Sequence, residues 1–207
     1  PAMATGDKPG ELLSAAARPL LGSLDAESLL LSPDHRPAHN MVSAWGSASI
    51  GSRSSIVHLE GPQTVLNRAA FEKDLLALAE TAGPERREAT LAHCSRSGDK
   101  WRLVLESGEV TANLVIDATG RKAAVARELA PRFRADRLAA WYGFLDQDPA
   151  SDVAPTQATL VEAAADGWFY ATLLADGRLA LNFFSDADLM RDLADGPSPT
   201  WRALLAS

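Results

Sequence analysis

Apolar residues recur at helical spacing in the second quarter of the chain. The side chains that would share one helical face are Phe71, Leu75, Leu78, Ala79 and Ala82. Asn67 can cap the amino end, because its side-chain oxygen accepts a backbone N–H, and Gly83-Pro84 ends the pattern. The spacing predicts a helix over residues 68–82.

Apolar and polar residues alternate further along, as is typical of strands. Trp101, Leu103 and Leu105 are separated by single residues, a turn follows at 106–109, and a return strand continues into the apolar run 114–116. A continuous apolar run is typical of a strand that is buried on both faces. We therefore predict a hairpin over residues 101–116 whose second strand ends fully buried.

The last third of the chain contains strand-like runs separated by turns instead of helices. The predicted strands are 141–145, 159–163, 168–174 and 178–184. Asp166-Gly167 and Asp176-Gly177 permit the positive φ of tight hairpins. These strands should form an antiparallel meander.

The first quarter has weaker patterns. Residues 12–21 are compatible with a short helix that Pro19 should end or bend. Residues 32–55 are rich in Ser, Gly, Pro and His and predict mainly loop, with a short strand at 54–59. The whole pattern indicates an α+β chain with two lobes.

Composition narrows the function. The chain has 207 residues, of which 46% are apolar, so it can bury a sizeable core. A net charge of −7 argues against nucleic acid as a partner. The single cysteine, Cys94, excludes an intrachain disulfide and a Cys-rich metal site, so a cytoplasmic protein is the default expectation. No apolar run reaches the roughly 18 residues of a transmembrane helix, and residues 1–6 resemble a remnant of cloning.

The most informative local segment is the apolar run 114–116 followed by Asp117, Ala118, Thr119 and Gly120 and a predicted helix over 122–129. Small residues at the end of a strand let a ligand approach the backbone, and the following helix end offers N–H groups to an anion. A plain tight turn at Gly120 explains the same residues. The pattern leaves both interpretations open.

The string Val-Ile-Asp-Ala-Thr-Gly-Arg at 115–121, together with Leu-Asn-Arg-Ala-Ala-Phe at 66–71, resembles the second half of the FAD domain in flavoprotein monooxygenases, flavin-dependent halogenases and geranylgeranyl-reductase-like proteins. The resemblance implies FAD as the cofactor and an α/β-derived fold of the aromatic-hydroxylase type. It implies that the cofactor-binding residues are Arg68, Asp117, Ala118, Thr119 and Gly120.

Weaker likenesses extend the resemblance over most of the chain. Residues 8–11 resemble the loop after a first βαβ unit, 43–46 resemble a substrate-side segment, and 166–187 resemble a substrate-lobe sheet also seen in flavoproteins that mature quinone cofactors. The resemblance implies an N-terminal segment 1–36, a substrate-lobe segment 37–63, an incomplete FAD-binding lobe 64–130 and an antiparallel-sheet substrate lobe 131–207.

Aromatic residues of the predicted sheet are candidates for a substrate pocket, although such residues are also ordinary core. The candidates are Trp45, His58, Trp141, Trp168 and Tyr170. Besides lining a pocket, His58 could serve as an acid or base, but no catalytic residue is assigned. The substrate could be a small aromatic molecule, a carrier-bound intermediate or a side chain of another protein.

Departures from the family pattern refine the hypothesis. The Gly-x-Gly-x-x-Gly fingerprint and the later Gly-Asp motif do not occur, so the chain resembles a fragment that should bind FAD weakly and be inactive alone. Thr119-Gly120 replaces the Asp-Gly of hydroxylases that use NAD(P)H directly, which favours reduced flavin from a separate reductase. Residues 168–173 match the halogenase Trp-x-Trp-x-Ile-Pro motif poorly, which favours hydroxylation or another oxidation. The alternative is a non-catalytic domain that presents its sheet to a partner.

Other chemistry has little support in the sequence. Asp34, His35 and His39 share one loop, but no metal site is predicted because Pro33 and Pro37 exclude a helical ligand pair. Ser54 and Ser55 lack the Gly-x-Ser-x-Gly context of a hydrolase. We expect Cys94 to be a small buried residue that fills space in the core, and not a nucleophile.

Overall fold

The computed structural model describes residues 12–47, 49–55, 59–152, 154 and 156–189. The described residues divide into two compact units, one formed by 80–135 and the other by those within 12–79 and 136–189. The division falls within the segment 64–130 that the sequence predicts as one lobe. The predicted segment boundaries remain predictions.

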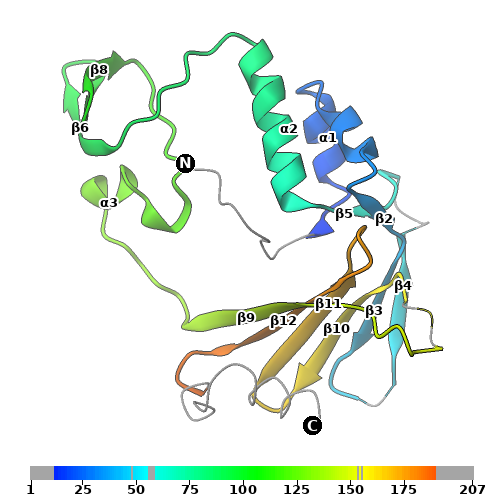
Figure 1. The fold of residues 1–207 in the computed structure, drawn as a ribbon. Coiled ribbons are helices and arrows are strands. Elements are labelled where there is room, and N and C mark those ends of the chain that lie inside the picture. The colour runs from blue at the N-terminus through cyan, green and yellow to red at the C-terminus, as the bar shows by residue number, and fades with distance from the viewer. Residues whose placement is uncertain (1–11, 48, 56–58, 153, 155, 190–207) are drawn as a thin grey trace. The chain divides into compact units, whose positions relative to one another are not determined.

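The first unit contains a three-stranded antiparallel sheet (Figure 1), in which β7 (Lys100–Leu105) pairs with both β6 (Leu91–Ser97) and β8 (Gly108–Ala112). The β7–β8 pair confirms the predicted hairpin. Cys94 of β6 is 2% exposed, which confirms it as a buried filler, and burial followed by the Glu128 charge raises the pKa of its thiol. Glu128 accepts the Cys94 N–H at 3.4 Å and approaches His93 Nδ1 at 3.0 Å, so helix α3 (Ala126–Leu129) is attached to β6.

The predicted buried strand at 114–116 is wrong. The segment is not in a strand, and Leu114 and Ile116 are 73% and 81% exposed. A strand is stabilised by its neighbours, and no strand among the described residues pairs with this segment. The predicted helix 122–129 is also too long, because left-handed Ala123 separates a 3₁₀ turn, η3 (Gly120–Lys122), from α3.

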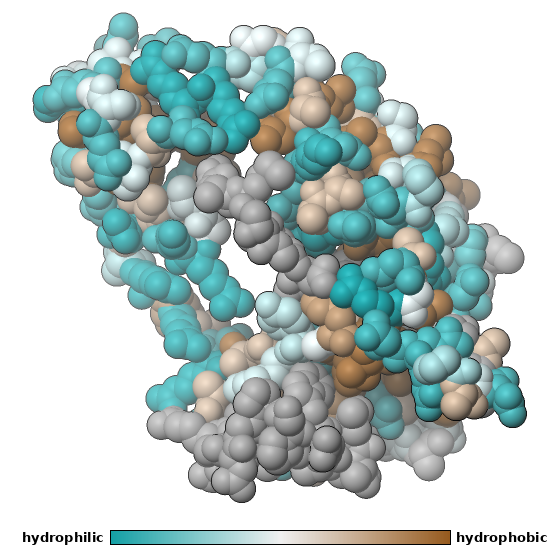
Figure 2. All heavy atoms as spheres, in the orientation of Figure 1, coloured by the Kyte–Doolittle hydropathy of each residue, from teal (hydrophilic) through white to brown (hydrophobic). Residues whose placement is uncertain are grey.

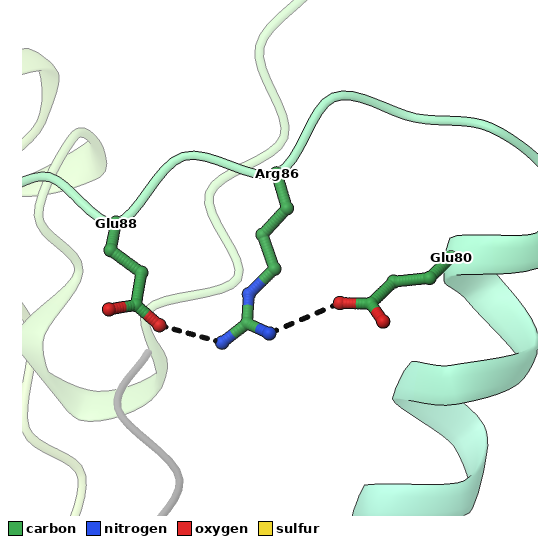
Figure 3. Close-up of polar contacts among 3 residues, drawn as sticks. All are labelled: Glu80, Arg86 and Glu88. Atoms are coloured by element: carbon green, nitrogen blue, oxygen red, sulfur yellow. Dashed lines mark hydrogen bonds and ion pairs between the residues drawn. The ribbon is translucent and has the colours of Figure 1, made fainter.

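An ion-pair bridge follows helix α2 (Arg68–Thr81), as Figure 3 shows. Arg86 lies between two carboxylates, 3.1 Å from Glu80 in the last turn of the helix and 2.9 Å from Glu88. All three side chains are largely exposed, so water screens the pairs and their contribution to stability is small.

The second unit contains α2 and a small apolar core. The predicted helix is confirmed, and Asn67 caps it by accepting the Ala70 N–H at 3.1 Å. Its buried face belongs to a cluster of Leu21, Ala26, Leu30, Leu66 and Phe71. Helix α1 (Ala17–Gly22) supplies Leu21, and the 3₁₀ helix η1 (Glu27–Leu31) supplies Leu30. Ala26 is the residue that precedes η1. Pro19 neither ends nor prevents α1, because it lies in the first turn, where no N–H is needed.

Two sheets complete this unit. The smaller sheet has the order β1 (Leu12–Leu13), β5 (Gln63–Val65) and β2 (Arg36–Ala38). The larger has the order β4 (Gly51–Ser54), β3 (Asn40–Ala44), β10 (Thr159–Ala164), β11 (Gly167–Leu173), β12 (Leu179–Asp186) and β9 (Leu138–Leu145). Only β3 and β10 are parallel (Figure 1). The four C-terminal strands are confirmed, but β9 pairs with β12, so the meander comprises β10, β11 and β12 alone.

The predicted loop over 32–55 is wrong, since it contains β2, β3 and β4. These strands are rich in small and polar residues and carry no local alternation. β3 and β4 form because β3 pairs with β10, more than a hundred residues away in sequence, and β2 forms because it pairs with β5, so the decisive contacts are non-local. The predicted strand 54–59 is replaced by β4, and residues 56–58 lie outside the described residues.

The architecture confirms the α+β fold class. Hydrophilic side chains cover much of the visible face, with hydrophobic ones scattered among them (Figure 2). None of the helices in the described ranges has the length and apolar character needed to cross a membrane.

Candidate functional site

The loop after residue 116 is organised by one carboxylate. Asp117 Oδ1 accepts the Thr119 N–H at 3.1 Å and the Thr119 hydroxyl at 2.5 Å. Asp117 Oδ2 accepts the N–H groups of Val125 and Ala126, both at 2.9 Å. The Thr119 hydroxyl oxygen accepts the Ala124 N–H at 2.7 Å. The loop is therefore closed on itself by side-chain oxygens.

These bonds change the electrostatics of Asp117. The Thr119 hydroxyl, followed by the Ala126 and Thr119 backbone N–H groups, holds the pKa of this carboxyl well below its usual range. The Asp117 side chain is thus a stable anion at neutral pH. Its charge stabilises the amino end of α3, where backbone N–H groups point outward.

The same bonds bear on the expected anion site. N–H groups at the start of the helix were expected to be available to an anionic ligand, but those of Val125 and Ala126 already donate to Asp117. Gly120 differs, because a Cβ built on it meets no atom within 4 Å and its φ is +61°. Open space beside a residue without a side chain is compatible with close approach of a flat or extended ligand.

Arg68, the other predicted cofactor residue, begins α2. Its Nη2 donates to Glu72 Oε1 at 2.7 Å, one helical turn away. Arg68 belongs to the second unit, and residues 117–120 belong to the first. The predicted cofactor residues are therefore divided between the two units.

His35 supports the start of this helix. The side chain is 7% exposed, and its Nδ1 accepts the backbone N–H of Asn67, the capping residue, at 3.1 Å. Its ring meets Phe71 edge-on with centroids 5.9 Å apart. Within the described ranges no three His, Cys, Asp or Glu side chains cluster as metal ligands. His35 holds the helix that carries Arg68.

Strand register brings three of the predicted pocket residues onto one face of the large sheet, named here the tryptophan face. Trp168 and Tyr170 alternate along β11 and therefore point to the same side. Trp45, which follows β3, has its ring 6.4 Å from that of Trp168. Trp168 also stacks on Phe184 of β12, with centroids 4.0 Å apart and planes inclined by 9°. The result is a row of aromatic rings that extends from the end of β3, past β10, to β11 and β12.

Trp141 lies on the opposite face. It pairs with Phe183, and both belong with Phe169 to the apolar cluster beneath the sheet. Its neighbour Tyr142, 48% exposed, pairs with Asn182 and shares the tryptophan face instead. The structure thus separates Trp141 from the other aromatic candidates, and His58 lies outside the described residues.

Several residues of the tryptophan face escaped sequence reasoning. Thr159 and Thr172 are both buried, and their hydroxyls share a hydrogen bond at 3.1 Å; Asn182 is 3% exposed. Buried polar groups on an otherwise aromatic face are typical of a surface that orients a ligand or a neighbouring element. Alternation along β12 could have placed Asn182 and Phe184 on one side, but only the register shows that Trp168 and Tyr170 share it.

Known proteins supply the context for this geometry. No protein-family model matches the chain. LodB of Marinomonas mediterranea, described as an FAD-dependent oxidoreductase, is 27% identical over 176 residues, which are 82% of this chain and 47% of LodB.

Solved structures share the fold. The myxobacterial chondrochloren halogenase CndH, an FAD-dependent halogenase, superimposes with a TM-score of 0.79 at 21% identity, covering 97% of this chain and 48% of CndH. The peptidyl tryptophan dihydroxylase QhpG gives a TM-score of 0.61 at 20% identity, covering 91% of this chain and 44% of QhpG. The chain spans about half the length of each of these proteins.

Proposed function

We propose that the chain is part of an FAD-dependent oxidoreductase of the monooxygenase and halogenase type, which it resembles in sequence and in fold. In this proposal the Thr119-Gly120 turn of the first unit lies at the cofactor, and the large sheet of the second unit faces the substrate. The observation that carries the cofactor assignment is the open space at Gly120 within the segment 115–121 that resembles the family's cofactor-side string.

The residues present fit FAD in a limited way. The backbone at Gly120 can approach a flavin nucleotide because no side chain intervenes. The Arg68 guanidinium can interact with a phosphate, although Glu72 already neutralises part of its charge. When bound, the flavin would supply the redox chemistry, and this chain would position the reactants and exclude water.

The tryptophan face is the proposed substrate wall. Trp45 is 58% exposed beside the stacked pair Trp168 and Phe184, so a planar group can lie against its ring. This arrangement favours an aromatic substrate, either a free molecule, a carrier-bound intermediate or a side chain of a protein. QhpG, which shares the fold, acts on a peptidyl tryptophan.

We favour oxidation or hydroxylation over halogenation, with reduced flavin delivered by a separate reductase. The support comes from the sequence: β11 carries Trp168-Phe169-Tyr170 in place of the halogenase Trp-x-Trp motif, and the turn has Thr119 where directly reduced hydroxylases have Asp. A product that gains oxygen and never halide, formed only when a reductase is supplied, is the expected result.

Substitution of Gly120 by Val tests the cofactor assignment in the flavin-loaded protein. If the turn approaches the cofactor, the branched side chain should fill the space and remove most flavin per folded molecule. Gly98→Val is the matched control, because Gly98 has φ +59° and equally open surroundings in the turn between β6 and β7. Both variants should lose about 1–3 kcal/mol of stability from the strained backbone. Normal flavin content in folded Gly120→Val protein would defeat the assignment.

A further inference from the structure

The two oxygens of Asp117 hold opposite ends of one loop. Oδ1 accepts the N–H and the hydroxyl of Thr119, two residues along the chain, and Oδ2 accepts the N–H groups of Val125 and Ala126 at the start of α3. A single carboxylate thereby closes the segment 117–126. A neutral amide could not do the same, because its nitrogen accepts no hydrogen bond.

The enclosed backbone is strained. Gly120 has φ +61° and Ala123 has φ +44°, so two left-handed residues lie between the two ends that Asp117 joins. Alanine rarely adopts this conformation, because its Cβ crowds the backbone. Such a conformation persists only where surrounding contacts hold it. In this loop the side chains of Asp117 and Thr119 supply those contacts.

We propose that Asp117 is a positioning residue, and not a cofactor ligand, whose carboxylate holds the Thr119-Gly120 turn in the shape that meets FAD. The choice of FAD as the cofactor rests on the proposed function. The closure of the loop by Asp117, called the latch below, rests on the hydrogen bonds alone. The four hydrogen bonds that Asp117 accepts all come from its own loop. In this proposal the cofactor therefore contacts the open side of Gly120.

The first test follows the loop alone. In this chain, Asp117→Ala should speed hydrogen exchange of the Val125 and Ala126 amides by about tenfold or more, because each loses its acceptor. Amides of β7 should be unaffected. Asp148→Ala is the matched control: it removes the same side chain from an exposed turn, where Asp148 accepts the Ala150 N–H. It should leave the exchange of residues 124–126 unchanged.

The second test concerns the cofactor. In the flavin-loaded protein, Asp117→Ala should weaken FAD affinity by about tenfold or more and shift the visible absorption of the flavin that remains. Asp148→Ala should change neither. The spectrum matters because a merely less stable fold would lower flavin content without altering the surroundings of bound flavin.

The outcomes separate the two ideas. If hydrogen exchange of the Val125 and Ala126 amides is unchanged, the latch is overturned, whatever the flavin affinity and absorption show. Faster exchange with unchanged flavin affinity and spectrum overturns the positioning role. If the unaltered protein does not bind FAD even when FAD is added in large excess, the proposed function fails and the positioning role with it, while the exchange result still decides whether Asp117 closes the loop.

Discussion

Ala123 and Asp25 are the two non-glycine residues with positive φ in the part of the chain that the structure describes. Ala123 lies in the loop that Asp117 closes, so one residue bears backbone strain while another supplies the hydrogen bonds that hold it. At the scale of the residue, the candidate cofactor turn is thus defined by conformations and bonds that can be tested one at a time.

Replacing Ala123 by Gly should stabilise the protein. The left-handed conformation costs a residue with a Cβ about 1–2 kcal/mol, and the greater freedom of glycine in the unfolded chain offsets about half of this. We expect a net gain of up to about 1 kcal/mol in denaturant unfolding. Ala124→Gly is the control, since Ala124 has no positive φ and should lose stability. If Ala123→Gly lowered the free energy of unfolding as much as Ala124→Gly does, the backbone at Ala123 would not be strained.

The stability that Asp117 provides should depend on pH in one direction. Because its folded-state pKa is lowered, this contribution is complete above the ordinary Asp pKa of about 3.9 and is lost as pH falls toward the folded-state value. The difference in Tm between the unaltered protein and Asp117→Asn should be constant between about pH 5 and pH 8 and shrink below about pH 4. Thermal melts across this range measure it, and a difference that grows on acidification would refute the interpretation.

At the scale of elements, Arg36 joins the two sheets of the second unit. It lies in β2, and its Nε donates to the carbonyl of Leu173 at the end of β11 at 2.7 Å. Its Nη2 donates to the carbonyl of Gln157, just before β10, at 3.2 Å. Burial lowers the pKa of this guanidinium, whose acceptors among the described residues are backbone carbonyls. The guanidinium group therefore ties the small sheet to the large sheet.

Arg36→Lys should weaken this junction, because one ammonium cannot reproduce the spread of the guanidinium donors. We expect a loss of about 1–3 kcal/mol, the usual contribution of hydrogen bonds to a charged group, in urea unfolding. Arg53→Lys in β4 is the matched control, since Arg53 is exposed and should change stability little. Equal effects of the two substitutions would show that Arg36 does not join the sheets.

At the scale of the whole molecule, this chain spans about half the length of the relatives it resembles. Its sequence contains no Gly-x-Gly-x-x-Gly fingerprint, whose helix end receives the cofactor pyrophosphate in dinucleotide-binding folds. The N–H groups at α3 do not substitute for it, because Asp117 accepts them.

The 207-residue chain alone should therefore bind FAD weakly, with a Kd above about 1 µM. Fluorescence titration of the purified chain measures this affinity, with riboflavin, which lacks the pyrophosphate, as the comparison ligand. Similar weak binding of both is expected if the pyrophosphate has no site. Sub-micromolar binding of FAD would contradict the prediction.

The sequence by itself determined the elements whose signals are local. The cap at Asn67 and the apolar face from Phe71 onward define α2, and the Asp-Gly turns define the hairpins of β10, β11 and β12. In each case the residues that form the element lie within a few positions of one another. The family resemblance was also readable, because it depends on short strings and their order.

Only the tertiary structure decided what depends on distant partners. β3 and β4 carry no clear pattern and form because β10 offers an edge, and Trp141 faces the core because β9 pairs with β12 in one register. Shifting that register by one residue would exchange Trp141 with Tyr142. The role of Asp117 was hidden for the same reason: a carboxylate meets four donors only when two left-handed residues fold its loop back on itself, and no spacing in the sequence reports those angles.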